Sequence, residues 1–410
     1  MQGIESNILD TLKLDTALRL AKKKSKEGSP LEARTIYKDI LYKFPKNKKA
    51  IDGIKALLSN AIGKASDVQD PPQDRLQLLI NLYEQGKLEQ ALNQATSLLR
   101  KFPNSVMLYN VCGIACQGLG QLDTAISNFK QAISIKPGYA DTYSNMGLAL
   151  QEKNKPEEAI KAYKKALSIK PDYAEAYSNM GNALQDQGKI EDSIEAYNKA
   201  LDIKPDNADA HYNLGNALQD QGKLEEAIEA YKKALSLKPG YADTYSNMGV
   251  ALQEKNKLEE AIEAYKQALA IKPDNAAAYH NMGSALNDQG KPREALAAYK
   301  KALAIKPDYP EAYNNMGGVL NVQGKPGEAL AAYKKALAIK PNYADAHYNL
   351  GNTLQDQGKP EEALAAYKKA LEINPDFSNA SAEMGQCMLK IGKFEEGRSL
   401  IQKTDGSISL

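Results

Sequence analysis

The chain has 410 residues, with 53 Lys and Arg against 51 Asp and Glu, so its formal net charge is only +2. This near balance gives no global field that would favour nucleic acid or an anionic membrane as a partner. Three Cys, an odd number with no metal-like spacing to His, argue against a disulfide framework. No run approaches the ~20 apolar residues of a membrane span, and residues 1–24 lack the apolar core of a secretory signal. We therefore expect a soluble, cytoplasmic protein.

The N-terminal third predicts helices in an irregular order. Residues 1–13 are interpreted as a short leader, and residues 14–58 predict a divergent helical pair followed by one further helix. The stretch 59–71 is loose and ends in proline, so it is the only plausible linker. Two more divergent helical pairs are expected over 72–139.

Residues 140–377 are seven copies of one 34-residue unit, with no insertion between copies. Counting from Ala140 as position 1, every copy has Gly at position 8, Tyr at 24, Ala at 27 and Pro at 32. Position 20 is Ala in six copies and Ser193 in the other. Apolar residues recur at helical spacing in both halves of the unit. Each copy therefore predicts two helices, and the small residues at positions 8, 20 and 27 allow those helices to approach closely.

A turn separates the two predicted helices of each copy. Five copies have Gly in this turn, whereas Asn154 and Asn256 occupy the same place in the other two. Gly adopts a positive φ freely, and Asn tolerates it better than most residues. We therefore predict a positive φ at this position.

The pattern resembles the tetratricopeptide repeat, although Tyr or His stands at position 4, where Trp is commonest in that family. The resemblance implies an all-α, right-handed superhelical solenoid of antiparallel helix pairs, each pair being one 34-residue unit. Residues 378–410 would form an incomplete capping repeat and tail, because Gly397 and Ile401 replace the usual Ala and Tyr.

In this family the first helices line the concave surface, with positions 2, 5, 6, 9, 12 and 13 pointing into it. Position 6 is Asn in all seven copies, which resembles the asparagine ladder of O-GlcNAc transferase repeat regions. An amide has both a donor and an acceptor for the backbone of an extended peptide. Alternatively, each Asn bonds only its neighbour or solvent, and copying maintains it. The residues are Asn145, Asn179, Asn213, Asn247, Asn281, Asn315 and Asn349.

The same surface is predicted to be acidic. Positions 2 and 13 are each acidic in six copies, and no Lys or Arg occupies the six groove positions. Such a groove should repel nucleic acid and acidic peptides, and it lacks the basic clamp with which some family members hold chaperone C-termini. An ordinary solvated surface is the alternative. The carboxylates are Asp141, Glu175, Asp209, Asp243, Glu311 and Asp345 at position 2, and Glu152, Asp186, Asp220, Glu254, Asp288 and Asp356 at position 13.

No motif for catalysis or cofactor binding is present. His211 and His347 stand where other copies place a packing Tyr, which predicts a structural role, and His280 is alone at position 5. Cys112 and Cys116 take core positions and are expected to be buried thiols. Without a phosphate-binding loop, a metal-spaced cluster or a nucleophile motif, we predict no enzyme activity, metal, cofactor or small-molecule substrate.

The sequence thus predicts a scaffold or adaptor that binds partner proteins or extended peptides in its groove, and that binds neither nucleic acid nor membrane. A second interpretation comes from the stretch beginning at Pro71, which resembles the repeat region of bacterial multidomain enzymes. In those enzymes the array precedes a glycosyltransferase, sulfotransferase or iron-dependent oxygenase domain. This chain would then be a substrate-recruiting region whose catalytic domain is supplied elsewhere.

Overall fold

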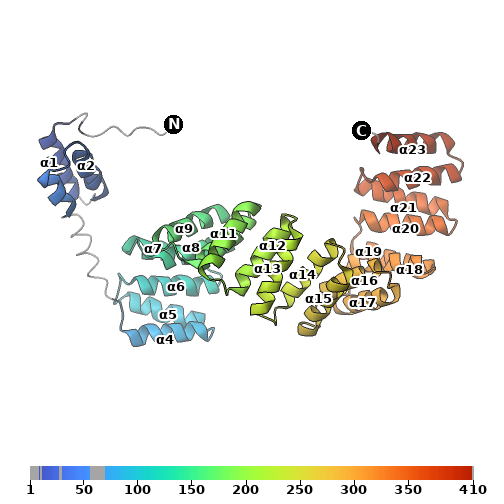
Figure 1. The fold of residues 1–410 in the computed structure, drawn as a ribbon, viewed down its shortest axis with the longest axis horizontal. Coiled ribbons are helices and arrows are strands. Elements are labelled where there is room, and N and C mark those ends of the chain that lie inside the picture. The colour runs from blue at the N-terminus through green and yellow to red at the C-terminus, as the bar shows by residue number, and fades with distance from the viewer. Residues whose placement is uncertain (1–8, 10–11, 27–29, 56–69, 409–410) are drawn as a thin grey trace. The chain divides into compact units, whose positions relative to one another are not determined.

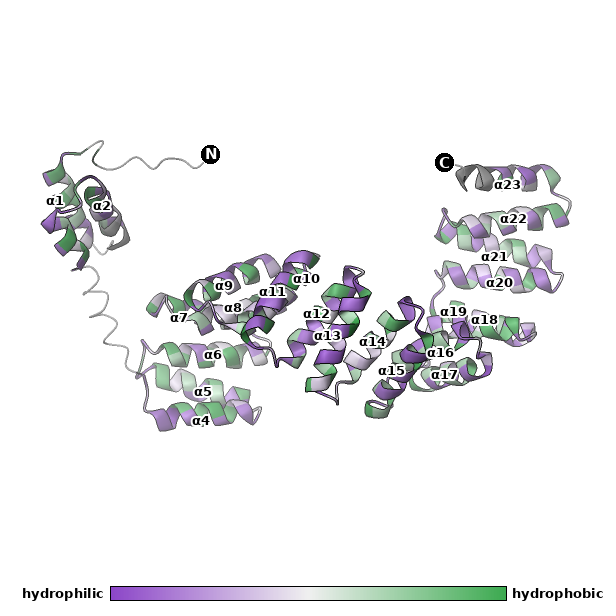
Figure 2. Cartoon of the chain, in the orientation of Figure 1, coloured by the Kyte–Doolittle hydropathy of each residue, from purple (hydrophilic) through white to green (hydrophobic). Residues whose placement is uncertain are grey.

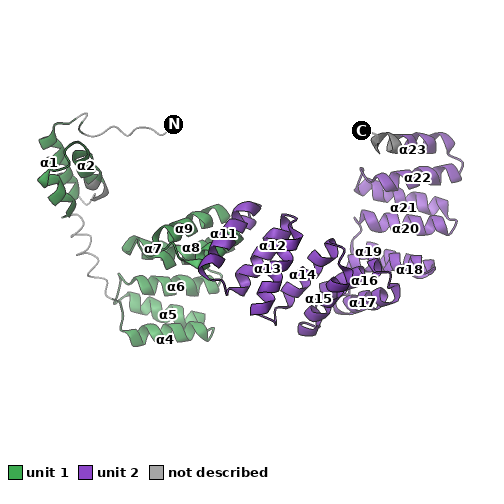
Figure 3. Cartoon of the chain, in the orientation of Figure 1, with its two compact units in different colours: residues 1–183 green, residues 184–410 purple. Residues whose placement is uncertain are grey.

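The computed structural model of the chain describes residues 9, 12–26, 30–55 and 70–408 (Figure 1). Most of the predicted leader and residues 59–69 of the predicted linker lie outside these ranges. The described residues form α-helices and no strand, and they divide into two compact units, residues 1–183 and 184–410 (Figure 3). The predicted fold class, an all-α helical-repeat solenoid built from helix pairs, is confirmed.

Unit 1 contains the irregular helices and the first regular copy. Residues 48–55 are also helical, and Gly53 lies against the ring of Tyr37 from α2. Helix α10 crosses the division between the units. The helices are α1 (Leu14–Lys26), α2 (Pro30–Lys43), α4 (Gln73–Glu84), α5 (Leu88–Leu99), α6 (Val106–Gly118), α7 (Leu122–Ile135), α8 (Ala140–Glu152), α9 (Pro156–Ile169) and α10 (Ala174–Gln185).

Unit 2 contains most of the regular array and the capping pair, α22 and α23. Its helices carry both hydrophilic and hydrophobic residues (Figure 2), as expected for amphipathic helices that bury one side. They are α11 (Ile190–Ile203), α12 (Ala208–Asp220), α13 (Leu224–Leu237), α14 (Ala242–Glu254), α15 (Leu258–Ile271), α16 (Ala276–Asp288), α17 (Pro292–Ile305), α18 (Pro310–Val322), α19 (Pro326–Ile339), α20 (Ala344–Asp356), α21 (Pro360–Ile373), α22 (Ser378–Lys390) and α23 (Phe394–Ile408). None of the described helices of either unit is long and apolar enough to cross a membrane.

The turns inside the helix pairs have the predicted backbone. Asn154 and Asn256 have φ values of 57° and 58°, and Gly222 has 78°. The amide of Lys155, just after the turn residue, donates to the carbonyl of Leu150 at 2.9 Å. This bond satisfies a helix-end carbonyl, as in a Schellman motif, so the prediction of positive φ is confirmed.

In six of the seven regular copies, a glycine of the first helix lies against a tyrosine ring of the second helix. A Cβ atom built on Gly249 of α14 would lie 2.6 Å from Cε1 of Tyr265 on α15, and Gly215 meets Tyr231 in the same way. These rings are fully buried. The ring therefore occupies the space that any side chain at position 8 would need, which explains why small residues pattern the unit.

The first helices of unit 2 lie on the inner side of the stack. Each of the helices α12, α14, α16, α18 and α20 contacts the next first helix, ending at α22, whereas no comparable contact joins successive second helices in the described part of the unit. First helices are therefore closer together than second helices. We call the surface formed by their positions 2, 5, 6, 9, 12 and 13 the first-helix face.

Candidate functional site

The predicted asparagines lie half-buried on the first helices. In unit 2 they follow one another along α12, α14, α16, α18 and α20, as Asn213, Asn247, Asn281, Asn315 and Asn349. Asn145 on α8 and Asn179 on α10 are half-buried as well. The amides thus form a row, with part of each side chain accessible from the first-helix face and part packed against a neighbour.

Several of these amides already bond the preceding copy. Asn247 Nδ2 donates to Tyr212 Oη at 3.2 Å and to Asn216 Oδ1 at 2.9 Å. Asn349 Nδ2 donates to Asn314 Oδ1 at 3.0 Å in the same way. In the sequence analysis, a hydrogen bond from each Asn to a neighbouring side chain was the alternative to peptide binding. Asn247 and Asn349 do make such bonds. A ligand on this row would have to share or exchange these bonds.

A second row of hydrogen bonds connects the same helices. Gln185 Nε2 donates to Asp220 at 2.7 Å, and Gln253 Nε2 donates to Asp288 at 2.9 Å. Gln219 Nε2 reaches Glu254 at 3.4 Å. Each bond joins a position 12 amide to the position 13 carboxylate of the next copy, and we call it the amide–carboxylate bridge. The recurrence of Gln at position 12 is the sequence feature from which this bridge could have been predicted.

Buried tyrosines donate hydrogen bonds to the glutamines of these bridges. Tyr231 Oη donates to Gln219 Oε1 at 2.9 Å, and Tyr265 Oη donates to Gln253 Oε1 at 3.3 Å. With its oxygen engaged by a phenol, each amide directs its NH₂ group toward the carboxylate. In these pairs the packing tyrosine therefore also orients a polar group on the first-helix face.

The predicted carboxylates are mostly exposed, but Asp209 and Glu311 at position 2 have cationic partners. Lys238 Nζ lies 3.5 Å from Asp209, and Lys340 Nζ lies 3.2 Å from Glu311. Although burial acts to raise it, hydrogen bonds from its own backbone and from Lys340 lower the pKa of Glu311. Asp141 and Glu311 are half-buried, whereas the exposed carboxylates are Glu152, Glu175, Asp186, Asp209, Asp220, Asp243, Glu254, Asp288, Asp345 and Asp356.

These lysines modify the predicted charge of the face. Both lysines stand at position 31, just after the second helix of their copy, and each lies against the position 2 carboxylate of the same copy. In unit 2 the position 13 row is therefore the more strongly anionic of the two, because its carboxylates Asp220, Glu254 and Asp288 bond neutral amides and keep their charge uncompensated by those partners.

His280 is a polar junction that the sequence did not reveal. Its Nδ1 lies 3.1 Å from Asn281 Oδ1, and its Nε2 lies 3.0 Å from Asn315 Nδ2. Burial lowers the pKa of His280. The neutral ring therefore donates from Nδ1 and accepts at Nε2, which connects two members of the asparagine row. Being the one His at position 5 was its only sequence signal.

The remaining candidates are structural. His211 Nε2 lies 2.9 Å from the carbonyl of Pro205, and His347 Nε2 lies 3.1 Å from that of Pro341, so both rings fasten a helix to a preceding turn. Cys112 and Cys116 are buried, as predicted, and burial raises the pKa of Cys112 to about 11. In the described ranges no group of three or more His, Cys, Asp or Glu could hold a metal ion.

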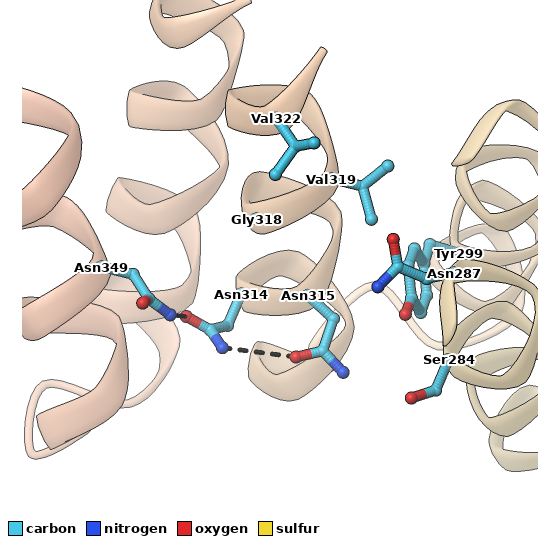
Figure 4. A pocket seen from close by; sticks show the side chains of 9 residues that line it. All are labelled: Ser284, Asn287, Tyr299, Asn314, Asn315, Gly318, Val319, Val322 and Asn349. Carbon is cyan, nitrogen blue, oxygen red and sulfur yellow. Dashed lines mark hydrogen bonds between the residues drawn. The ribbon is translucent and has the colours of Figure 1, made fainter. Parts of the chain in front are cut away.

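A pocket of about 330 Å³ opens on the first-helix face where α16, α18 and α20 meet (Figure 4). Here Asn287 stands at position 12 and Val322 at position 13 of the next copy, so the amide–carboxylate bridge cannot form. Gly318, at position 9, leaves further space, because a Cβ there would meet only Tyr333 Oη at 3.9 Å. The pocket therefore results from three departures from the repeat pattern. All three are visible in the sequence, but the pattern alone did not predict that they form a site.

Comparisons with known proteins agree with this geometry. A family model described as TPR repeat matches residues 113–154, 152–188, 181–222, 215–256, 253–290, 283–324 and 319–358, and one described as tetratricopeptide repeat matches 344–377. A comparison with curated proteins gave no significant match.

Several solved structures are similar. The crystal structure of MamA is 33% identical over 40% of this chain and 95% of its own, with a TM-score of 0.39. YrrB, described as a TPR protein with an unusual peptide-binding site, is 30% identical over 46% of this chain and 96% of its own, with a TM-score of 0.39. A tetratricopeptide repeat protein from Parabacteroides merdae is 17% identical over 61% of this chain and 98% of its own, with a TM-score of 0.50.

Proposed function

Because the chain belongs to the tetratricopeptide repeat family, a family of protein-interaction scaffolds, we propose that its first-helix face binds extended segments of partner proteins. One observation carries this proposal. Five half-buried amides, from Asn213 to Asn349, follow one another along the first helices of unit 2. An extended backbone presents alternating donors and acceptors along its length, which amides can match without reading side chains.

The charge of the face selects the partner. Asp220, Glu254, Asp288 and Asp356 at position 13 are exposed, and no Lys or Arg occupies the six groove positions of the regular copies. A segment rich in Lys or Arg is attracted to such a surface, whereas nucleic acid and acidic segments are repelled. The proposed ligand is therefore an extended, basic segment of a protein.

When a peptide binds, the amides of the row exchange a hydrogen bond to a neighbouring side chain for one to the peptide backbone. Asn247 and Asn349 now bond neighbouring side chains, so a ligand backbone replaces one partner by another. The net gain for each amide is then modest, about 0.5–1.5 kcal/mol. Useful affinity requires several amides to act together, which suits a ladder of equivalent positions.

The same face would serve substrate recruitment if this chain works beside a glycosyltransferase-, sulfotransferase- or oxygenase-type catalytic domain. The resemblance of the stretch that begins at Pro71 to the repeat region of bacterial multidomain enzymes favours this second role. We place either role in the reducing cytoplasm, a choice that the three buried, unpaired Cys support. The repeats carry the binding, and no catalytic role is assigned to them.

The test is a titration of the full chain with blocked synthetic peptides in which Lys alternates with Gly around one central Tyr. Replacing Asn213, Asn247, Asn281 or Asn315 singly by Ala should weaken binding several-fold. The quadruple replacement should weaken it about a hundred-fold or more, since the small terms add, while the helical circular dichroism is retained.

Two controls accompany this titration. Asn198, exposed on the second helix α11, is replaced by Ala as the matched substitution away from the face, and it should leave affinity unchanged. Peptides with Glu in place of Lys should not bind. Equal affinity of the quadruple variant and the unmodified chain would show that the peptide binds elsewhere.

A further inference from the structure

The pocket at α16, α18 and α20 lies where three residues differ from those at the same positions of other copies. At three other junctions of unit 2, a Gln bridges to the carboxylate of the next copy, as between Gln253 and Asp288 at 2.9 Å. Here Asn287 is one methylene shorter than Gln, and Val322 has no polar atom. Position 9 is Asn in three other copies but Gly318 here. Three side-chain groups that would fill or bridge the gap are thus absent from one place.

The lining divides into an apolar wall and a polar wall. Val319 and Val322 project from α18, and across from them lie Asn287 of α16 and Tyr299 of α17 (Figure 4). Val322 is 86% exposed, an apolar side chain in a row that is otherwise acidic. None of the residues that line the pocket is charged. The pocket therefore suits an uncharged group with an apolar body and a polar tip.

One rim of the pocket is held by a hydrogen-bonded series of amides. Asn314 is 7% exposed; its Nδ2 donates to Asn315 Oδ1 at 3.3 Å, and its Oδ1 accepts from Asn349 Nδ2 at 3.0 Å. Because these amides fix one another, their positions do not depend on a ligand. Asn315 and Asn349 also belong to the asparagine row, so the pocket opens directly beside the proposed path of the peptide backbone.

We propose that this pocket is a specificity pocket that receives one tyrosine side chain of the bound segment. The ring packs on Val319, Val322 and the bare backbone at Gly318, and the phenol reaches the polar wall that includes Asn287. A volume of about 330 Å³ is near the lower end for ligand pockets, which suits one large side chain. Asp288 and Asp356, on the copies before and after Val322, attract basic residues on either side of the tyrosine.

This inference depends on the proposed function, because the tyrosine belongs to the segment that the asparagine row binds. It adds to the extended, basic segment of the proposed function one residue type: an aromatic residue with a hydroxyl, flanked by Lys or Arg. Such a residue buries a large rigid surface and still satisfies its polar tip. A charged residue at the same place would lose its hydration without gaining an ion pair in a pocket with an uncharged lining.

The experiment uses blocked peptides in which Lys alternates with Gly and only the central residue changes, to Tyr, Phe, Leu, Asp or Gly. The unmodified full chain should bind the Tyr peptide about ten-fold more tightly than the Gly peptide, with Phe and Leu between them and Asp weakest. Gly318→Asn should remove the preference for Tyr, so that the Tyr and Gly peptides bind this variant with equal affinity. Asn already occupies position 9 as Asn216 and Asn352, so the change suits the fold.

The matched control is Val250→Asn, the same position 9 substitution on α14, outside the pocket. It should retain the preference for Tyr. A preference for Tyr that survives Gly318→Asn, or equal affinity for the Tyr and Gly peptides in the unmodified chain, would overturn the specificity pocket and leave the asparagine row intact. Failure of every peptide to bind the unmodified chain would overturn the proposed function together with this inference.

Discussion

Replacing Gly249 by Ala should destabilise the array, whereas the same replacement at Gly318 should stabilise it. Both glycines lie within first helices, one residue apart in the repeat register. A Cβ at Gly249 would lie 2.6 Å from Cε1 of Tyr265 and 2.9 Å from both Cδ1 and Cζ. That ring is fully buried and cannot turn into solvent. A Cβ at Gly318 would meet no side chain closer than Tyr333 Oη at 3.9 Å, apart from its two chain neighbours.

The expected magnitudes follow from these contacts. Overpacking a buried site costs about 1–3 kcal/mol, and Ala recovers up to about 1 kcal/mol relative to Gly through helix propensity. Gly249→Ala should therefore cost about 1–2 kcal/mol of unfolding free energy. Gly318→Ala keeps only the propensity term and should gain about 0.5–1 kcal/mol.

The assay is urea denaturation of the full chain, followed by far-ultraviolet circular dichroism and fitted with a nearest-neighbour model because repeat arrays need not unfold in two states. A second arm measures Gly249→Ala in a Tyr265→Leu background, where the ring atoms that cause the clash are absent. The cost of the Ala should then largely disappear. Shifts of equal sign for the two Gly→Ala changes would refute the proposed role of the tyrosine ring.

Two further predictions concern pH. Burial lowers the pKa of His280 below its ordinary value of 6.5, so the unfolded chain binds that proton more readily, and stability should fall as the pH decreases from about 7 to about 5. His280→Tyr, which places there the residue of Tyr212 and Tyr348, should weaken this dependence, and denaturation midpoints that keep it unchanged would contradict the assignment. Burial raises the pKa of Tyr299 and Tyr333 to about 12, so stability should be lost as the pH rises above 10, their ordinary value. Ultraviolet titration should show a class of late-ionising phenols that merges with the rest in denaturant.

The helix pair was predictable because its causes are local and repeated. Helical spacing of apolar residues fixes each helix, and a positive φ at Asn154 and Asn256 follows from the turn alone. The contact between Gly249 and Tyr265 joins residues only 16 apart, within one hairpin. The same residues recur at these positions in the seven copies. The period, the packing residues and the placement of the asparagines on the first helices could therefore be predicted from the sequence.

The chemistry of the site was decided between copies, where the sequence pattern does not specify partners. Asn349 bonds Asn314, and Gln253 bonds Asp288, across separations of 35 residues, and only the stacking of neighbouring pairs determines which side chains meet. The amides look equivalent in the sequence, yet the residues around them in the preceding copy give each a different set of bonds. The pocket beside Gly318 depends on three small departures that coincide in space, because a gap opens only where no neighbour fills it.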